Sequence, residues 1–92
     1  MKKNDNIIAR TIHGAFFLID ISDNYAGDKC ALYELNETGK YLWDHITKES
    51  TIESLAHQLF DAILDKVDYQ IIYADTAEFL RLLQHKGFLS EV

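Results

Sequence analysis

The stretch YELNETGKYLW, residues 33–43, contains the point at which the sequence changes from a strand-like to a helix-like pattern. Before Asn36, apolar and polar side chains alternate, which is typical of a strand with one buried face. After it, apolar residues recur at helical spacing, namely Leu42, Trp43 and Ile46. Asparagine is a favoured N-cap, and the carboxylate of Glu37 would lie in the first turn, where the helix dipole stabilises it. We therefore predict that a strand ends and a helix begins at Asn36.

We call this strand-to-helix transition at Asn36 the joint. Two further strands are predicted before it. Residues 7–12 and 15–21 are rich in β-branched and aromatic side chains, and a short polar-glycine turn separates them. Both faces of residues 15–21 are largely apolar, which predicts that this strand is the central one. Turn-forming residues at 22–28 predict a loop, and residues 30–35 predict the third strand.

Two further helices are predicted after the joint. Ser50 and Glu53 match the capping box S-x-x-E, and the apolar stripe that follows comprises Ile52, Leu55, Ala56, Leu59, Phe60 and Ile63. Asp68 is the expected N-cap of the last helix, and Gly87 is its expected end. The core stripe of this helix comprises Ile72, Thr76, Phe79, Leu80 and Leu83. Three strands followed by three helices predict an α+β fold, with residues 1–92 forming a single domain.

The charge of the chain is concentrated in its helical half. Residues 1–36 carry four Lys/Arg and five Asp/Glu (net −1), whereas residues 37–92 carry five and ten (net −5). A negative surface repels phosphate backbones, so nucleic acid is not the expected partner. The N-terminal segment has no continuous apolar run, and no stretch approaches the length of a membrane span. We expect a cytoplasmic protein without a membrane partner.

The sequence offers no pattern that is typical of a catalytic or metal site. Glu53, His57 and Asp61 would share one helix face, but a solvated polar face produces the same spacing. Cys30 is the only cysteine, and its position in a predicted strand favours an apolar role over that of a nucleophile. Phosphate-binding glycine loops and nucleophile elbows are absent. We therefore expect no enzyme activity, no cofactor and no metal.

Two apolar residues of the last predicted helix lie away from its core stripe. Ile71 and Leu82 project on the same side as Asp75 and Glu78. They would either widen the core or line a groove with an acidic rim. Composition alone favours the core, because apolar side chains at the edge of a stripe are usually covered.

The joint and the C-terminal pattern together resemble the PqqD family of peptide-binding domains, also called RiPP recognition elements. The matching features lie within residues 15–89 and are Leu35-Asn36-Glu37-Thr38-Gly39, Leu42-Trp43, Phe79-Leu80, Leu83 and Gly87-Phe88-Leu89. The resemblance implies a winged-helix-like fold in which a three-stranded antiparallel sheet is followed by three helices. The loop at 22–28 departs from the family pattern, because it is longer than the family's tight glycine turn.

The resemblance also implies a function. Members of the family bind the leader segment of a ribosomally made precursor peptide and present it to a maturation enzyme, such as a radical-SAM protein, a cyclase or a leader protease. Many relatives are fused to a larger enzyme, whereas this chain is expected to act in trans.

By the same resemblance, the leader adds as a strand to the edge of the third strand and lies in a groove against the third helix. The implied peptide-binding residues are Cys30, Ala31, Leu32, Tyr33, Glu34, Ile71, Asp75, Glu78 and Leu82. An open strand edge is normally an aggregation liability, so a docking role explains why it would be left open. The same edge would also allow a homodimer.

The alternative hypothesis is a winged-helix nucleic-acid-binding or transcriptional regulatory domain. Its recognition helix would need basic side chains. The third predicted helix carries Arg81 and Lys86 but also Asp75 and Glu78. The acidic residues and the charge of the helical half disfavour this alternative.

Overall fold

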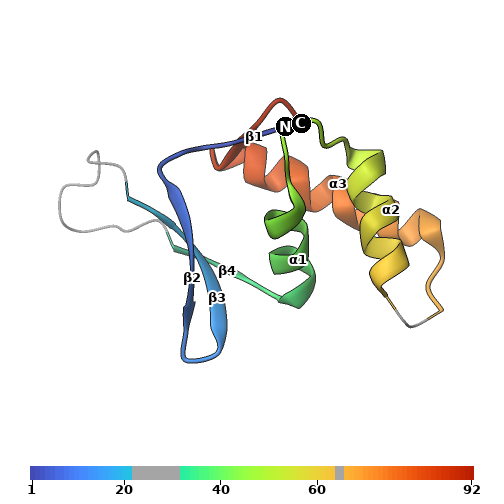
Figure 1. The fold of residues 1–92 in the computed structure, drawn as a ribbon, viewed down its shortest axis with the longest axis horizontal. Coiled ribbons are helices and arrows are strands. Elements are labelled where there is room, and N and C mark those ends of the chain that lie inside the picture. Colours follow the sequence, from blue (N-terminus) through green and yellow to red (C-terminus); the bar gives the residue numbers. More distant parts are fainter. Residues whose placement is uncertain (22–31, 64–65) are drawn as a thin grey trace.

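The computed structural model describes residues 1–21, 32–63 and 66–92. Along the chain its elements are β1 (Lys2–Lys3), β2 (Ile7–Ile12), β3 (Ala15–Asp20), β4 (Leu32–Leu35), α1 (Glu37–His45), α2 (Ile52–Ala62), α3 (Tyr69–His85) and β5 (Leu89–Ser90). The predicted α+β fold, with a three-stranded sheet followed by three helices, is confirmed (Figure 1). The loop predicted at 22–28 and the first two residues of the predicted third strand lie outside the described residues.

The main sheet is antiparallel with the order β2-β3-β4, so the predicted central strand is central. A two-residue turn joins β2 to β3, and both of its residues have positive φ, 51° at His13 and 81° at Gly14. This is the turn geometry whose twist matches that of the flanking strands. The inner face of the sheet contributes Ile7, Leu18 and Leu35 to the core, while the far end of the hairpin projects away from the helices (Figure 1).

The joint between β4 and α1 has the predicted cap. Asn36 is extended (φ −78°, ψ 178°), and its Oδ1 accepts a hydrogen bond of 2.8 Å from the Gly39 N–H. A Cβ at Gly39 would lie 3.2 Å from Asn36 Oδ1 and 3.3 Å from both Leu35 Cδ2 and Phe79 Cε1. The absent side chain therefore lets the strand end, the cap and α3 meet at one point. Trp43 is buried next to this joint, as predicted.

The start of α2 differs from the prediction. The N-cap is Thr51, which forms a reciprocal capping box with Ser54 instead of the predicted box of Ser50 and Glu53. Ser50 Oγ instead accepts a hydrogen bond of 2.9 Å from the Thr47 N–H. Because Ser50 Oγ is occupied by the Thr47 N–H, Thr51 caps the helix in its place.

The apolar stripe predicted for α2 includes Phe60, but this residue is not buried. It is 39% exposed. The buried residues of α2 are Leu55, Ala56 and Leu59. Phe60 falls beside this stripe and contacts the ring of Tyr69 edge-on, with 5.5 Å between ring centroids.

The last helix begins and ends where the sequence indicates. Asp68 accepts a hydrogen bond of 3.0 Å from the Gln70 N–H, and Gly87 takes a positive φ of 80°. The chain then turns back so that β5 pairs with β1, an antiparallel pair that we did not predict. Both ends of the chain therefore lie together beside the helices (Figure 1). Burial lowers the pKa of Lys3 in β1, whose ammonium lies 4.7 Å from the Trp43 ring centroid.

Candidate functional site

Strand β4 forms one edge of the described sheet, and the hydrogen-bond alternation shows which of its groups face outward. The Ile21 N–H donates to the Asn6 carbonyl at 2.8 Å, so this opposed pair is hydrogen-bonded. Hydrogen-bonded pairs recur at every second residue of an antiparallel ladder. It follows that Phe16 and Leu18 point their backbone groups away from β2 and toward β4.

The partners of Phe16 and Leu18 on β4 are Leu35 and Tyr33. The backbone N–H and C=O groups of these two residues therefore form hydrogen bonds with β3. The backbone groups of the intervening residues, Leu32 and Glu34, point to the open edge. Both side chains are exposed, with 55% of Leu32 accessible. The edge thus offers two donors and two acceptors in the alternating order that an added strand requires.

A cavity of about 380 Å³ begins where β4 ends. It lies between the first turns of α1, one residue of α2 and the middle of α3, and it is lined by Asn36, Thr38, Gly39, Leu42, Leu59, Asp75, Thr76, Glu78, Phe79 and Leu82. The Asn36 cap and Gly39 hold β4 and α1 against α3, so the joint shapes this cavity as well as the fold.

Three of the four predicted α3 residues line this cavity: Asp75, Glu78 and Leu82. Leu82 is 39% exposed and Ile71 is 54% exposed, so both lie outside the core that composition alone favoured. Ile71 is on the same face of α3 but does not line the cavity. On β4, Leu32, Tyr33 and Glu34 lie on the edge strand, whereas Cys30 and Ala31 lie outside the described residues. Their roles in binding stay a prediction.

For other residues that line the cavity, the sequence predicts a role as a helix cap or as a core residue. Leu42, Leu59 and Phe79 were placed on apolar stripes, and each also forms a wall of the cavity. Thr76 was placed on the core stripe of α3, and its side chain is fully buried. Its hydroxyl has no hydrogen-bond partner among the described residues, although buried polar atoms are normally paired. A polar residue at a core position was the sequence signal for this feature.

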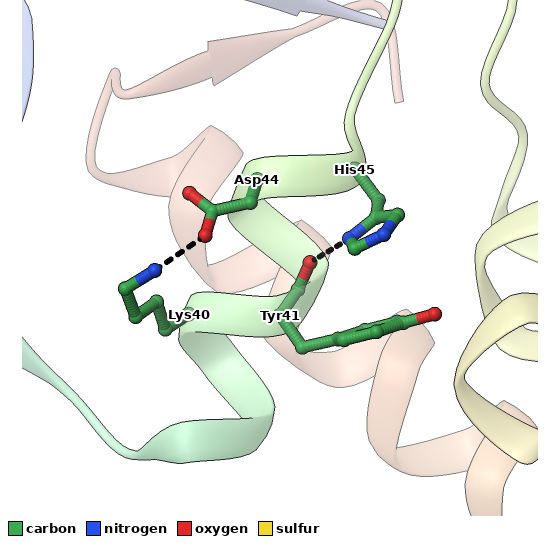
Figure 2. Close-up of polar contacts among 4 residues, drawn as sticks. All are labelled: Lys40, Tyr41, Asp44 and His45. Atoms are coloured by element: carbon green, nitrogen blue, oxygen red, sulfur yellow. Dashed lines mark hydrogen bonds and ion pairs between the residues drawn. The ribbon is translucent and has the colours of Figure 1, made fainter. Parts of the chain in front are cut away.

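The acidic rim of the cavity has no basic counterpart. Asp75 and Glu78 make no hydrogen bond or ion pair with any residue that the structure describes. The ion pair found within the described residues is on α1, where Lys40 Nζ lies 2.6 Å from Asp44 Oδ2 (Figure 2). Lys40 is therefore already paired within its own helix.

The opposite flank of α3 is covered by α2. The ring of Tyr69 stacks on His57 with 4.6 Å between centroids, and the Tyr73 hydroxyl donates to Glu53 at 3.3 Å. Helix α2 is also tied to α1, because the Tyr41 hydroxyl donates to the Gln58 carbonyl at 3.2 Å. Figure 2 also shows a polar contact within α1, in which His45 Nδ1–H donates to the Tyr41 carbonyl at 2.7 Å. The flank bearing Asp75 and Leu82 is thus the open one.

Over residues 1–21, 32–63 and 66–92, the structure gathers no group of three His, Cys, Asp or Glu side chains that would hold a metal ion. In the same part of the chain, none of the helices combines the length and the apolar character needed to cross a bilayer.

Comparisons with known proteins agree with this geometry. Two solved structures share the fold. One, described as TbiB1 in complex with the TbiA(beta) leader peptide, has a TM-score of 0.76 and 20% identity over 100% of this chain and 98% of that one. The other, lasso peptide synthetase B1 complexed with the leader peptide, has a TM-score of 0.74 and 14% identity, and the match covers 98% and 96%.

Among curated proteins no sequence matches the chain. The family model of coenzyme PQQ synthesis protein D (PqqD) matches residues 25–89, which is well over half of the chain and includes the β4–α1 joint, the cavity and α3. The chain belongs to the PqqD family.

Proposed function

We propose that this protein captures the leader segment of a ribosomally made precursor peptide by strand addition and presents it to a modifying enzyme. The main support for this proposal is that the open edge of β4 lies next to a partly apolar cavity. An added strand would lie about 4.8 Å from β4 and use the outward backbone groups of Leu32 and Glu34.

The side chains of the added strand would divide into two sets. Those on the inner face, the face of Tyr33 and Leu35, would point toward the helical layer, where Phe79 and Leu82 offer apolar contact area. Those on the outer face would lie beside the exposed side chain of Leu32. Backbone pairing then supplies affinity, and the cavity supplies register and selectivity.

The comparisons support this assignment. The chain is a member of the PqqD family, and both structures that share its fold are described as complexes with leader peptides. In this proposal residues 1–92 act as one binding module, and the chemistry belongs to the enzyme that receives the peptide. That partner would be a maturation enzyme such as a radical-SAM protein, a cyclase or a leader protease.

The experiment is a calorimetric titration with synthetic N-terminal segments of the short reading frames that neighbour the gene. One segment should bind with a stoichiometry of one, and a scrambled peptide of equal composition should not. N-methylation of alternate residues in the docking segment should weaken binding, because it removes the donors that face β4. The other alternate set should tolerate methylation. Equal sensitivity at all positions, or no binding by any neighbouring segment, contradicts the proposal.

Self-pairing of the same edge would compete with the peptide. If a homodimer forms through β4, adding the peptide should convert it to monomers, which sedimentation velocity would detect. A dimer that persists with the peptide bound would place the dimer interface elsewhere.

A further inference from the structure

Every polar side chain that lines the cavity carries a hydrogen-bond acceptor, and two of them are carboxylates. These side chains are Asn36, Thr38, Asp75, Thr76 and Glu78, and no Lys, Arg or His is among the described residues that line the cavity. The Asn36 oxygen is already used by the Gly39 N–H. The two carboxylates, by contrast, have no partner among the described residues. The cavity is therefore rich in acceptors and carries negative charge.

A second observation points independently to a ligand. Thr76 is one of the residues that line this cavity, 0% of it is exposed, and its hydroxyl oxygen has no hydrogen bond with any residue that the structure describes. A threonine in a helix usually bonds to a carbonyl of the preceding turn, which this hydroxyl does not do. Leaving such a group unpaired destabilises the free protein, so a ligand that donates to it would recover a hydrogen bond.

The position of the cavity at the start of α1 does not favour an anion. A helix N-terminus attracts negative charge through its free N–H groups. Here the Asn36 side chain caps the Gly39 N–H, and the carboxylate of Glu37 lies in the first turn. Asp75 and Glu78 add two further negative charges at the rim. The electrostatics of the whole cavity therefore favour a cation.

We propose that this cavity receives one basic side chain, Arg or Lys, of the bound peptide. The inference rests on the proposed function and specifies the substrate class of that same site. The aliphatic stem of the basic side chain would lie along Phe79 and Leu82, and its charged head would donate to the rim carboxylates. A guanidinium has five donors, so one that pairs with a rim carboxylate still has donors for the Thr76 hydroxyl.

The test is a selection from a display library of random peptides long enough to span β4, using the immobilised protein. Selected peptides should share Arg or Lys at one fixed position of their aligned register. In a representative peptide, replacing that residue by norleucine should weaken binding about tenfold, the scale of one charge-assisted hydrogen bond. Thr76→Val should reduce the affinity for the basic peptide more than for its norleucine counterpart.

The double variant Asp75→Asn/Glu78→Gln should select peptides without the basic position. The control Glu49→Gln/Asp61→Asn removes the same charge from exposed residues that do not line the cavity, and it should keep the preference. Peptides that bind without a fixed basic residue, or a basic preference that survives the rim variant, overturn this inference and leave the proposed function standing. Enrichment of no peptide at all overturns both.

Discussion

Replacing the unpaired hydroxyl should stabilise the free protein. In Thr76→Val a methyl group takes the place of a hydroxyl of similar size, at a fully buried position in the middle of α3. Valine and threonine have similar helix propensities, so the backbone term is small. An unsatisfied buried polar group costs about 1–3 kcal/mol, and a single neutral hydroxyl belongs at the lower end of this range. We expect the free energy of unfolding to rise by about 1 kcal/mol.

For a domain of this size, that change raises the thermal midpoint by about 4–8 °C. Urea denaturation and thermal melts followed by circular dichroism would measure both quantities. Thr76→Ser is the matched control, since it keeps the hydroxyl and removes a buried methyl group. This control should lower the free energy of unfolding by about 1 kcal/mol.

A loss of about 1 kcal/mol or more in the free energy of unfolding of Thr76→Val would contradict an unpaired hydroxyl. That outcome would mean that the hydroxyl is hydrogen-bonded in the folded protein and that the cavity has no vacant acceptor. The expected result has a further consequence. The same substitution should stabilise the fold and weaken peptide binding, which is the opposition expected where a site keeps an unpaired group for its ligand.

The remaining predictions concern the joint, the groove and the N-terminal strand. Trp43→Ala should lower the free energy of unfolding by about 3–5 kcal/mol in urea melts, because the ring is 4% exposed; a neutral effect would make the ring dispensable to the core. Asn36→Ala should cost about 1 kcal/mol in the same melts through loss of the cap, and an unchanged midpoint would show that the cap contributes nothing. Leu82→Glu should abolish peptide binding in calorimetry without changing the thermal midpoint, whereas Phe60→Glu, on α2 and at the same 39% exposure, should bind normally. Unfolding of the first variant would place its side chain in the core. Burial lowers the folded-state pKa of Lys3 below 10.5, so the unfolded chain holds that proton more tightly. The free energy of unfolding should therefore increase as the pH rises from the folded-state pKa to 10.5. This increase should be smaller in Lys3→Met, and an equal increase in the two proteins would contradict the pKa shift.

The joint could be predicted from the sequence because its signals are local. The cap at Asn36, the acidic first turn and the change of period lie within a few residues of one another. Each depends only on backbone geometry near the helix start. The same is true of the two-residue turn between β2 and β3 and of the caps of α3. The apolar side chains on both faces of residues 15–21 likewise predicted that β3 is the central strand of the sheet.

Other features depend on contacts between distant segments. The β1–β5 pair joins residues at opposite ends of the chain and consists of two residues on each side, so it leaves no periodic signal. For the candidate site, the burial of Thr76 could be predicted from its stripe, but its missing partner could not, because that depends on which neighbours reach the hydroxyl.

The close contact at Gly39 connects the stability of the fold to the shape of the cavity. Leu35 ends the edge strand, Asn36 caps the helix, and the Phe79 ring forms a wall of the cavity, and all three converge on the one position that has no side chain. A residue with a Cβ there would gain about 1 kcal/mol of helix propensity but would have to displace a cap atom, a buried leucine or the ring. Of the three residues, Leu35 is the buried one, so the Asn36 cap or the Phe79 ring would have to move, and both line the cavity. The glycine in the LNETG run therefore preserves the space in which a peptide side chain would be held.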